Sequence, residues 1–364
     1  MILSLLACKP ADTSSLKWTV AGTLPADTKG LAGPVVGVLD NKLIIAGGCN
    51  FPDSMPWLGG RKKYYKKGYF FSKEKALAIV DSFDLPFDIA YASSCTTDRG
   101  IVVAGGENEN GISNKTFLIR AKPSGGVEMD SLRDLPFALT NAAVTALGNK
   151  IYLAGGELPE MVSDKFLTLD LDNIAKGWQP LPPLRRPVSH AVMVAQHNGA
   201  EPCIYLIGGR KRNAGGISDL YADVDQFDIA KNEWKQKHSL PYALSAGTGI
   251  AAGTHGILLF GGDQGATFHQ TESLIAAIDK EQDAARKQQL VQQKINLQFS
   301  HPGFSGEILN YNTIDDRWSI VDSLPFPTPV TTTAVRWNDA IWIPGGEIKA
   351  GVRTTQILSA TFTE

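Results

Sequence analysis

The sequence has no run of apolar residues long enough to cross a membrane as a helix. A bilayer-spanning helix needs roughly 20 such residues in a row, and no stretch of the 364-residue chain provides them. The sequence also has no excess of charge of one sign. It contains 35 basic and 37 acidic residues, so the formal net charge is −2. This balance argues against a general nucleic-acid or membrane surface.

Cysteine and histidine are scarce, with four and six residues respectively. Cys49, Cys95 and Cys203 stand near strand-like segments without the CxxC or His-paired spacing of metal sites, so we predict buried free thiols and no metal site. Other chemistries lack their motifs. We find no SxDxGxxW box of sialidase propellers, no GxSxG elbow and no Walker loop, and we predict no cofactor.

Glycine and proline, by contrast, are plentiful, with 36 and 20 residues, and they are ordered along the chain. A run of apolar residues ends in Gly-Gly six times, and Leu-Pro precedes each run. A loop and two further strand-like segments follow most pairs, the second often with Trp. Four strands per unit and a period near 50 residues are typical of propeller blades. The unit resembles the kelch repeat. The glycine pairs stand at 47–48, 105–106, 155–156, 208–209, 261–262 and 345–346.

The two ends of the chain complete one another. The last unit stops after its third strand, "TTQILSATFTE", and the missing Trp strand, "SLKWTVAGTLP", lies at residues 15–25. Pairing them in one blade removes an open sheet edge. We therefore predict an all-β, six-bladed kelch-type β-propeller over residues 15–364, closed by its N- and C-terminal strands.

Two units carry long insertions. The segment 49–75 is rich in aromatic residues, Pro and Gly, which indicates an ordered loop. The segment near 270–298 is rich in helix-forming residues and has a partial apolar stripe, so we predict one or two helices that cap a propeller face. Long loops in a compact domain are more often functional than accidental. The stripe consists of Leu274, Ile278, Ala285 and Leu290.

Residues 1–14 resemble the remnant of a secretory signal followed by a tether. "LLAC" is similar to the end of a bacterial lipoprotein signal, with Cys8 as the lipid-bearing residue. Only seven residues precede Cys8 and none is basic, which is short for a signal peptide. Either the start is truncated or the match is a chance one. We favour a truncated start and expect export to the periplasm, with a lipid on Cys8 as the only membrane contact, at the outer membrane.

The residues after the glycine pairs are the first candidates for a site. In a closed ring they recur around one face, so their polar groups converge near the axis, where a concave ligand site is expected. They are Cys49, Glu107, Glu157, Arg210, Asp263 and Glu347. The starts of the inner strands add Tyr91, Asn141, Arg186, Ser189, His190 and Ser245.

Structural alternatives stand beside these candidates. His190 is as readily a core histidine as a ligand contact, and Glu107 and Glu157 can be solvated loop charges, which we favour for Glu157. The run "RKKYYKKGY" at 61–69 is more simply a solvated basic loop. Glu347 and Arg353 can form an exposed ion pair of little consequence.

Three segments carry a resemblance to a known family, the bacterial N-acetylneuraminate epimerases, or sialic acid mutarotases. They are "WIPGGEIKAGVRT" near the end of the chain, "FGGDQGATFHQTESLIAAIDKEQ" with "LNYNTIDDRW", and "GGCNFPDSMPWLGGRKK". The blades that contain "GGCNFP" and "GGENENG" come first here, whereas their counterparts follow the catalytic blade in the better-known enzymes. The chain therefore resembles a cyclically permuted mutarotase.

The resemblance implies a six-bladed enzyme that interconverts the anomers of N-acetylneuraminate without a cofactor. Glu347 would transfer the proton, and Arg353 would be its catalytic partner and hold the C1 carboxylate bidentately. Other candidate substrate-binding residues are Arg186, His190, Asn50, Arg210 and Glu107. The predicted partner is a small sugar acid and no nucleic acid. The main alternative is a non-catalytic kelch propeller that binds a glycan or a protein, and a lyase or sialidase is a third hypothesis.

Overall fold

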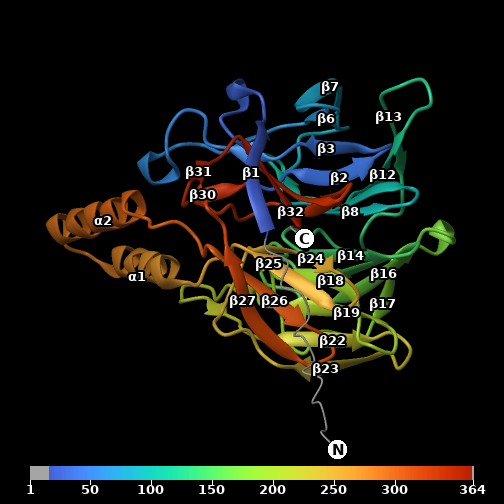
Figure 1. The fold of residues 1–364 in the computed structure, drawn as a ribbon. Helices are drawn as coiled ribbons and strands as arrows, with labels where there is room; N and C mark the ends of the chain where they lie inside the picture. Colours follow the sequence, from blue (N-terminus) through green and yellow to red (C-terminus); the bar gives the residue numbers. More distant parts are fainter. Residues whose placement is uncertain (1–15, 363–364) are drawn as a thin grey trace, which may run out of the picture.

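The chain forms a ring of six four-stranded antiparallel sheets in the computed structural model, which describes residues 16–362 (Figure 1). This confirms the predicted six-bladed propeller. From the axis outward, blades 1 to 3 are β2 (Val35–Leu39), β3 (Lys42–Ala46), β6 (Lys67–Lys73) and β7 (Leu77–Asp84); β8 (Ser93–Thr97), β9 (Gly100–Ala104), β12 (Thr116–Ala121) and β13 (Val127–Ser131); and β14 (Ala143–Leu147), β15 (Lys150–Ala154), β16 (Phe166–Asp170) and β17 (Gln179–Leu181).

The other three blades follow the same order, with the last one built from both ends of the chain. They are β18 (Val192–His197), β19 (Pro202–Ile207), β22 (Val224–Asp228) and β23 (Glu233–Lys237); β24 (Thr248–Ala252), β25 (Gly256–Phe260), β26 (Glu307–Asn312) and β27 (Arg317–Ser323); and β28 (Val335–Trp337), β29 (Ala340–Pro344), β32 (Gln356–Phe362) and β1 (Leu16–Thr23).

The ring is closed in blade 6, as predicted. Strand β1 pairs antiparallel with β32, with Leu16 opposite Phe362 and Trp18 opposite Ala360, and the two strands lie side by side in Figure 1. The Trp18 ring also meets Phe260 of blade 5 edge-on, with ring centroids 5.6 Å apart. The N-terminal strand therefore completes its own blade and packs that blade against its neighbour.

The hydrophobic core lies between adjacent blades. One buried cluster joins Val35 and Ile44 of blade 1 to Ile101 and Val103 of blade 2, and the other clusters repeat this pattern around the ring. A tryptophan of a fourth strand adds a hydrogen bond between neighbouring blades. The Trp318 indole N–H of blade 5 donates to the His238 carbonyl near blade 4, 3.0 Å away. Cys49 and Cys203 are buried free thiols, as predicted, and Cys95 is partly buried.

Each glycine pair ends the second strand of its blade at a point where a side chain does not fit. Gly155 has a φ of 65°, and a Cβ there would lie 2.0 Å from the Val188 carbonyl oxygen. The N–H of Gly156 donates to the same oxygen at 2.8 Å. The pair thus links one blade to the next through the backbone, which explains why the sequence repeats glycine here. We call this end of the ring the site face and the opposite end the far face.

Six residues, one per blade, form a belt that we call the waist ring: Gly33, Tyr91, Asn141, His190, Ala246 and Thr331. All have positive φ between 52° and 61°. Each backbone N–H donates to the carbonyl of the preceding member at 2.7–3.1 Å, and the Gly33 N–H donates to Thr331, so the six bonds close a circle around the axis. Five of these six residues are not glycine, so surrounding structure must hold their left-handed backbone.

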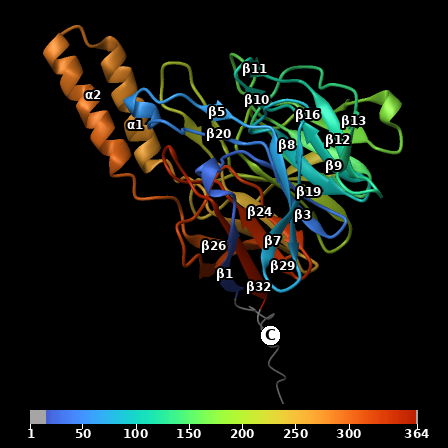
Figure 2. The ribbon, with the colours of Figure 1, turned by 90° about the horizontal axis from the view of Figure 1, so that it is seen from above.

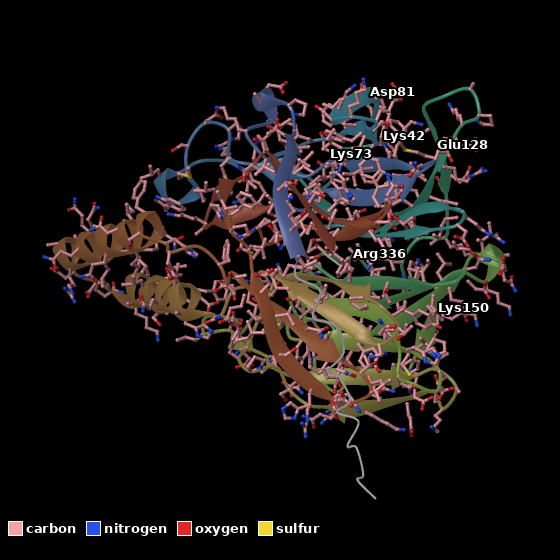
Figure 3. All side chains as sticks on the ribbon, viewed as in Figure 1. Lys42, Lys73, Asp81, Glu128, Lys150 and Arg336 are labelled. Carbon is pink, nitrogen blue, oxygen red and sulfur yellow. The ribbon has the colours of Figure 1, made fainter. Side chains whose placement is uncertain are left out.

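The waist ring divides the axial channel into two cavities. The far chamber, about 420 Å³, is lined by the inner strands, including Thr145, Ala195, Thr333 and Arg336. The site cavity, about 440 Å³, lies on the site face. Tyr91, Asn141, His190, Ala246 and Thr331 border both. Figure 3 shows the labelled side chains of Lys42 and Lys150, which lie in first-to-second-strand hairpins, on the side away from the helices.

The predicted helices are present and extend beyond the expected limits. α1 (Ala266–Lys280) and α2 (Ala284–Phe299) form a helical hairpin inserted between β25 and β26. Asp283 caps α2 by accepting from the Arg286 N–H at 2.7 Å. Figure 2 shows the hairpin projecting from the ring near β5. Only its base covers the propeller face, so the prediction of a cap applies to part of the insertion. Neither helix is long and apolar enough to cross a bilayer.

Short hairpins and turns lie on the site face. They are β4 (Cys49–Asn50) with β5 (Lys63–Tyr64), β10 (Glu107–Asn108) with β11 (Gly111–Ile112), β20 (Arg210–Lys211) with β21 (Asp219–Leu220), and β30 (Glu347–Lys349) with β31 (Val352–Arg353). Of the 3-10 turns in residues 16–362, Ala26–Thr28 and Pro56–Leu58 lie on this face, whereas Ile174–Lys176 lies between β16 and β17 on the far face. The segment predicted as an ordered loop, 49–75, is ordered and contains β4, β5, β6 and one of these turns.

Candidate active site

A repeated backbone contact places the residues after the glycine pairs around the axis. In every blade, the residue that precedes the waist ring forms an antiparallel bridge with the residue that follows Gly-Gly. The six bridges are Ala32–Cys49, Ala90–Glu107, Thr140–Glu157, Ser189–Arg210, Ser245–Asp263 and Val330–Glu347. Five of the six post-glycine residues line the site cavity. Cys49 is fully buried, and its thiol lies 3.3 Å from the Tyr91 hydroxyl.

The other wall of the site cavity comes from the two insertions. The base of the helical insertion contributes Thr267, Phe268, Thr271, Gln298, His301 and Phe304, and the 49–75 segment contributes Lys62. The cavity therefore lies between the waist ring below and the base of the helical hairpin above. It combines four carboxylates with aromatic and cationic groups, which is typical of a site for a polar small molecule.

Glu347 and Arg353 form an ion pair within one hairpin. They lie opposite each other in β30 and β31, and Nη1 of Arg353 is 2.7 Å from Oε2 of Glu347. The Gly351 N–H in the turn donates to Oε1 at 2.9 Å. Burial alone lowers the pKa of the Arg353 guanidinium, but the Glu347 carboxylate raises it overall. The pair is therefore a charged unit with a fixed geometry.

The two members of this pair differ in their access to the cavity. Glu347 lines the cavity, with 17% of its side chain exposed, whereas the Arg353 side chain is 4% exposed and is not part of the cavity wall. Arg353 lies over the Phe51 ring at 5.1 Å. The exposed ion pair considered as the structural alternative is wrong, because this pair is largely covered. Arg353 lies behind Glu347, where it orients the carboxylate.

Arg210 is the guanidinium that lines the cavity. Its Nη2 lies 3.2 Å from Nε2 of His190, and its plane lies over the Phe268 ring of α1 at 4.7 Å. Within residues 16–362, no carboxylate lies within 4.0 Å of it. Burial lowers the pKa of Arg210, but a guanidinium stays protonated in proteins. The cavity thus contains one cation without an ion-pair partner in the described part of the chain.

A hydrogen-bond chain with a defined direction fixes Arg210. A guanidinium only donates, so Nε2 of His190 must accept and its proton must lie on Nδ1. Nδ1 then faces the Ser189 hydroxyl at 3.2 Å, and that hydroxyl donates to Oε1 of Glu157 at 3.1 Å. Burial and the Arg210 charge lower the pKa of His190 well below its usual value, so the ring is neutral. Glu157, expected to be a solvated loop charge, is instead the end of this chain.

Glu107 and Lys62 form the second ion pair of the cavity wall, 2.9 Å apart. The Tyr64 hydroxyl also donates to Glu107 at 2.8 Å, and Lys62 lies over the Tyr91 ring at 5.0 Å. The basic run at 61–69 is therefore not simply a solvated loop, because Lys62 belongs to the cavity. Asp263 lines the same wall and accepts from the Gly265 N–H at 2.8 Å.

Besides Arg353, two residues predicted to bind substrate lie outside the cavity. Asn50 is 2% exposed, donates to the Gly30 carbonyl at 3.1 Å and accepts from Tyr65, so its amide ties the 49–75 segment to the chain before blade 1. Arg186 pairs with Asp223 and lies over the Tyr221 ring, in a small depression of blade 4. Both side chains are used by local structure, and the structure does not bring either to Glu347.

The sequence analysis did not single out three residues that the structure adds to the site: Lys62, Phe268 and His301. All three come from insertions, whose path cannot be inferred from the blade repeat. Among the described residues, no group of three or more His, Cys, Asp or Glu side chains is placed to hold a metal ion. The residues that line the cavity instead present hydrogen-bonding and charged groups to an organic ligand.

Comparisons with known proteins find relatives that share one name. The family model described as N-acetylneuraminate epimerase matches residues 132–364. The N-acetylneuraminate epimerase of Vibrio vulnificus is 24% identical over 237 residues, 64% of this chain and 59% of that protein. The enzyme of the same name from Brucella melitensis is 25% identical over 227 residues, 61% and 57% of the two chains. A kelch domain-containing protein of Vibrio cholerae is 21% identical over 248 residues, 65% of each.

The extent of these matches is partial. The aligned part spans less than two thirds of the length of the epimerases named above. The family model begins at residue 132, directly after β13, and so leaves out blades 1 and 2. A linear comparison is expected to lose these two blades if they follow the catalytic blade in the relatives, as the permuted blade order predicts.

Proposed function

The chain belongs to the N-acetylneuraminate epimerase family, and from this premise we propose that it interconverts the α and β anomers of N-acetylneuraminate or a closely related sugar acid. The observation that carries the proposal is Glu347, a carboxylate on the cavity wall whose Oε1 accepts from the Gly351 N–H and whose Oε2 is paired with Arg353. The reaction is an isomerisation that requires proton transfer between two oxygens of the sugar.

Glu347 suits this proton transfer because both reacting oxygens are bonded to the same carbon. Ring opening removes the proton of the anomeric hydroxyl and adds one to the ring oxygen, and ring closure on the other face reverses both steps. Each carboxylate oxygen has two lone pairs, so the hydrogen bond from Gly351 and the ion pair with Arg353 leave an acceptor position on each. One carboxylate can therefore accept the proton and return it. A positioned acid/base group contributes about 10²–10⁴-fold in rate.

Arg210 is better placed than Arg353 to bind the C1 carboxylate of the sugar. Arg353 is buried and paired with Glu347, whereas Arg210 lines the cavity with only one nitrogen engaged by His190. A planar guanidinium binds a carboxylate through two parallel hydrogen bonds. We therefore assign the carboxylate contact predicted for Arg353 to Arg210, and the positioning of Glu347 to Arg353.

The experiment that tests the function follows anomer conversion by NMR after α-N-acetylneuraminate is released by a sialidase. Wild-type protein is expected to accelerate formation of the β anomer over the spontaneous reaction, and Glu347→Gln should lower the rate by about 10²–10⁴-fold at an unchanged melting temperature. Glutamine has the same shape but cannot accept the proton. Wild-type rates in the variant would reject the assignment of Glu347.

The same assay decides between the proposed enzyme and the alternatives. A non-catalytic propeller would bind the sugar without accelerating conversion, and a sialidase or lyase would release cleavage products from a glycoside. Location in the periplasm is also a proposal. It rests on residues 1–8, which include Cys8 and lie outside the described residues. Fractionation of cells that produce the protein tests it.

A further inference from the structure

One histidine of the cavity wall has no role in the proposed reaction so far. His301 lies in the segment that returns from α2 to β26, and its side chain lines the site cavity although the residue is only 5% exposed. The segment lies next to the catalytic hairpin, because a Cβ on Gly303 would lie 3.5 Å from the Ile348 carbonyl oxygen. The ring also packs on Phe304, with centroids 5.0 Å apart.

The backbone determines which ring nitrogen of His301 carries the proton. The Gly303 N–H donates to Nδ1 at 3.0 Å, so Nδ1 accepts and the neutral ring is protonated on Nε2. Burial lowers the pKa of His301, and Lys349 lowers it further, whereas the Asp263 and Glu347 carboxylates raise it, with a net decrease. The side chain therefore offers the cavity a neutral N–H donor. Within residues 16–362, this Nε2 has no hydrogen-bond partner.

We infer that His301 is a second catalytic residue, which donates a hydrogen bond from Nε2 to the ring oxygen of the sugar as that oxygen becomes an alkoxide. The inference rests on the proposed mutarotase function. Glu347 takes the proton of the anomeric hydroxyl, the O–H electron pair forms the keto group, and the electrons of the C–O ring bond pass to the ring oxygen. Glu347 returns its proton to that oxygen. His301 stabilises the charge and neither gains nor loses a proton.

Substitution separates this role from simple packing. His301→Leu removes the donor and keeps similar bulk, and should lower kcat by about 10²–10³-fold, the typical effect of losing one oxyanion donor. His301→Gln retains an N–H donor near the position of Nε2 and should recover kcat to within about tenfold of wild type. KM should stay within about threefold in both, because the contact strengthens only in the transition state. His269→Leu, in α1 but away from the cavity wall, is the matched control and should leave kcat unchanged.

A neutral donor also differs from a general acid in its pH dependence. The charged groups that act on His301 are Asp263, Glu347 and Lys349. A protonated His301 acting as an acid would lose activity as pH rises through its pKa, which burial holds below the usual value of 6.5, so its fall in kcat would come below pH 7. A neutral donor instead predicts a kcat that does not fall as pH rises across that region, and the ¹⁵N shifts of His301 should show the Nε2–H form from pH 7 to 9.

The outcomes separate this inference from the function on which it rests. A reduced kcat in His301→Leu with recovery in His301→Gln, together with the Nε2–H form, supports it. Wild-type kcat in His301→Leu, or a ring protonated on Nδ1, overturns the role of His301 and leaves the mutarotase intact. If the wild-type protein does not accelerate anomer conversion, the proposed function fails and this role fails with it.

Discussion

The site cavity and the far chamber share one axis and enclose similar volumes, about 440 and 420 Å³, but their walls are built from different kinds of position. The far chamber is lined by inner strands, whose polar side chains bind the neighbouring blade. The Ser93 hydroxyl donates to the Ala142 carbonyl, and the Thr248 hydroxyl accepts from the Ala334 N–H at 2.7 Å. These groups are already satisfied by the fold.

The site cavity is lined by residues that follow the strands. Their backbone is fixed by the bridges to the residues before the waist ring, and five of the six line the cavity. Chemistry can therefore change at these positions without a change in the blade. The difference shows that a cavity of sufficient volume is not by itself a binding site. The functional groups come from the residues after the glycine pairs and from the two insertions.

The largest loss of stability is expected from deleting β1, the strand that completes blade 6. Deletion of Leu16–Thr23 takes Trp18 from the core and leaves β32 as an open edge. The protein should aggregate or lose several kcal/mol of stability, as large core losses do. Size-exclusion chromatography and thermal unfolding followed by circular dichroism measure this. A soluble variant with the wild-type melting temperature would show that blade 6 does not depend on β1.

Arg353→Lys tests whether Arg353 positions Glu347 or contacts the substrate. Lysine keeps the charge but lacks the planar group that orients Glu347, and a displaced catalytic group costs about 10²-fold in rate. We expect kcat to fall by about 10–100-fold with KM nearly constant. If KM rises while kcat stays constant, Arg353 contacts the substrate directly and the carboxylate role assigned to Arg210 is wrong.

Arg210→Lys should have the opposite kinetic signature. The variant loses one of two parallel hydrogen bonds to the sugar carboxylate, so KM should rise by about tenfold with little change in kcat. The matched substrate is the C1 amide of the same sugar, for which wild type and variant should have similar KM values. Equal effects on both substrates would assign Arg210 to the structure of the cavity wall.

Thr333→Ala tests the far chamber and should have the smallest effect. Thr333 lines this chamber, and a substitution away from packing and hydrogen-bond networks changes stability by about 0.5 kcal/mol or less. Both kcat and KM should equal those of wild type. A loss of activity comparable to that of Arg210→Lys would mean that substrate or an essential water chain reaches the far chamber.

The fold could be predicted almost completely from the sequence, because its signals are local and repeated. The glycine pairs mark the end of each second strand, and Trp18 at one terminus matches the missing strand at the other. The Glu347–Arg353 pair was also predictable, since both residues lie in one short hairpin. Their spacing did not reveal that Arg353 lies behind Glu347, because burial depends on Phe51 from another blade.

The rest of the site depends on contacts between distant segments. Lys62 and His301 come from insertions whose course is set by packing rather than by the repeat, and neither stands in a periodic position. The sequence predicts a loop charge at Glu157 because the partners of this carboxylate, Ser189 and His190, belong to the next blade. The sequence predicts a ligand contact at Asn50 because a polar residue in a motif gives no sign that its amide already donates to a backbone carbonyl.

The waist ring has a consequence for how the chain folds. Five of its hydrogen bonds join blades that are adjacent in sequence, but the bond from Gly33 to Thr331 joins residues almost the whole chain apart. Contacts at such separation slow folding, whereas the entropy of closing a loop rises only with the logarithm of its length. Closure therefore affects the folding rate more than the stability of the finished ring. Ends placed between two other blades would make this bond local and another one distant, so a cyclic permutation changes the order of assembly and leaves the active site where it was.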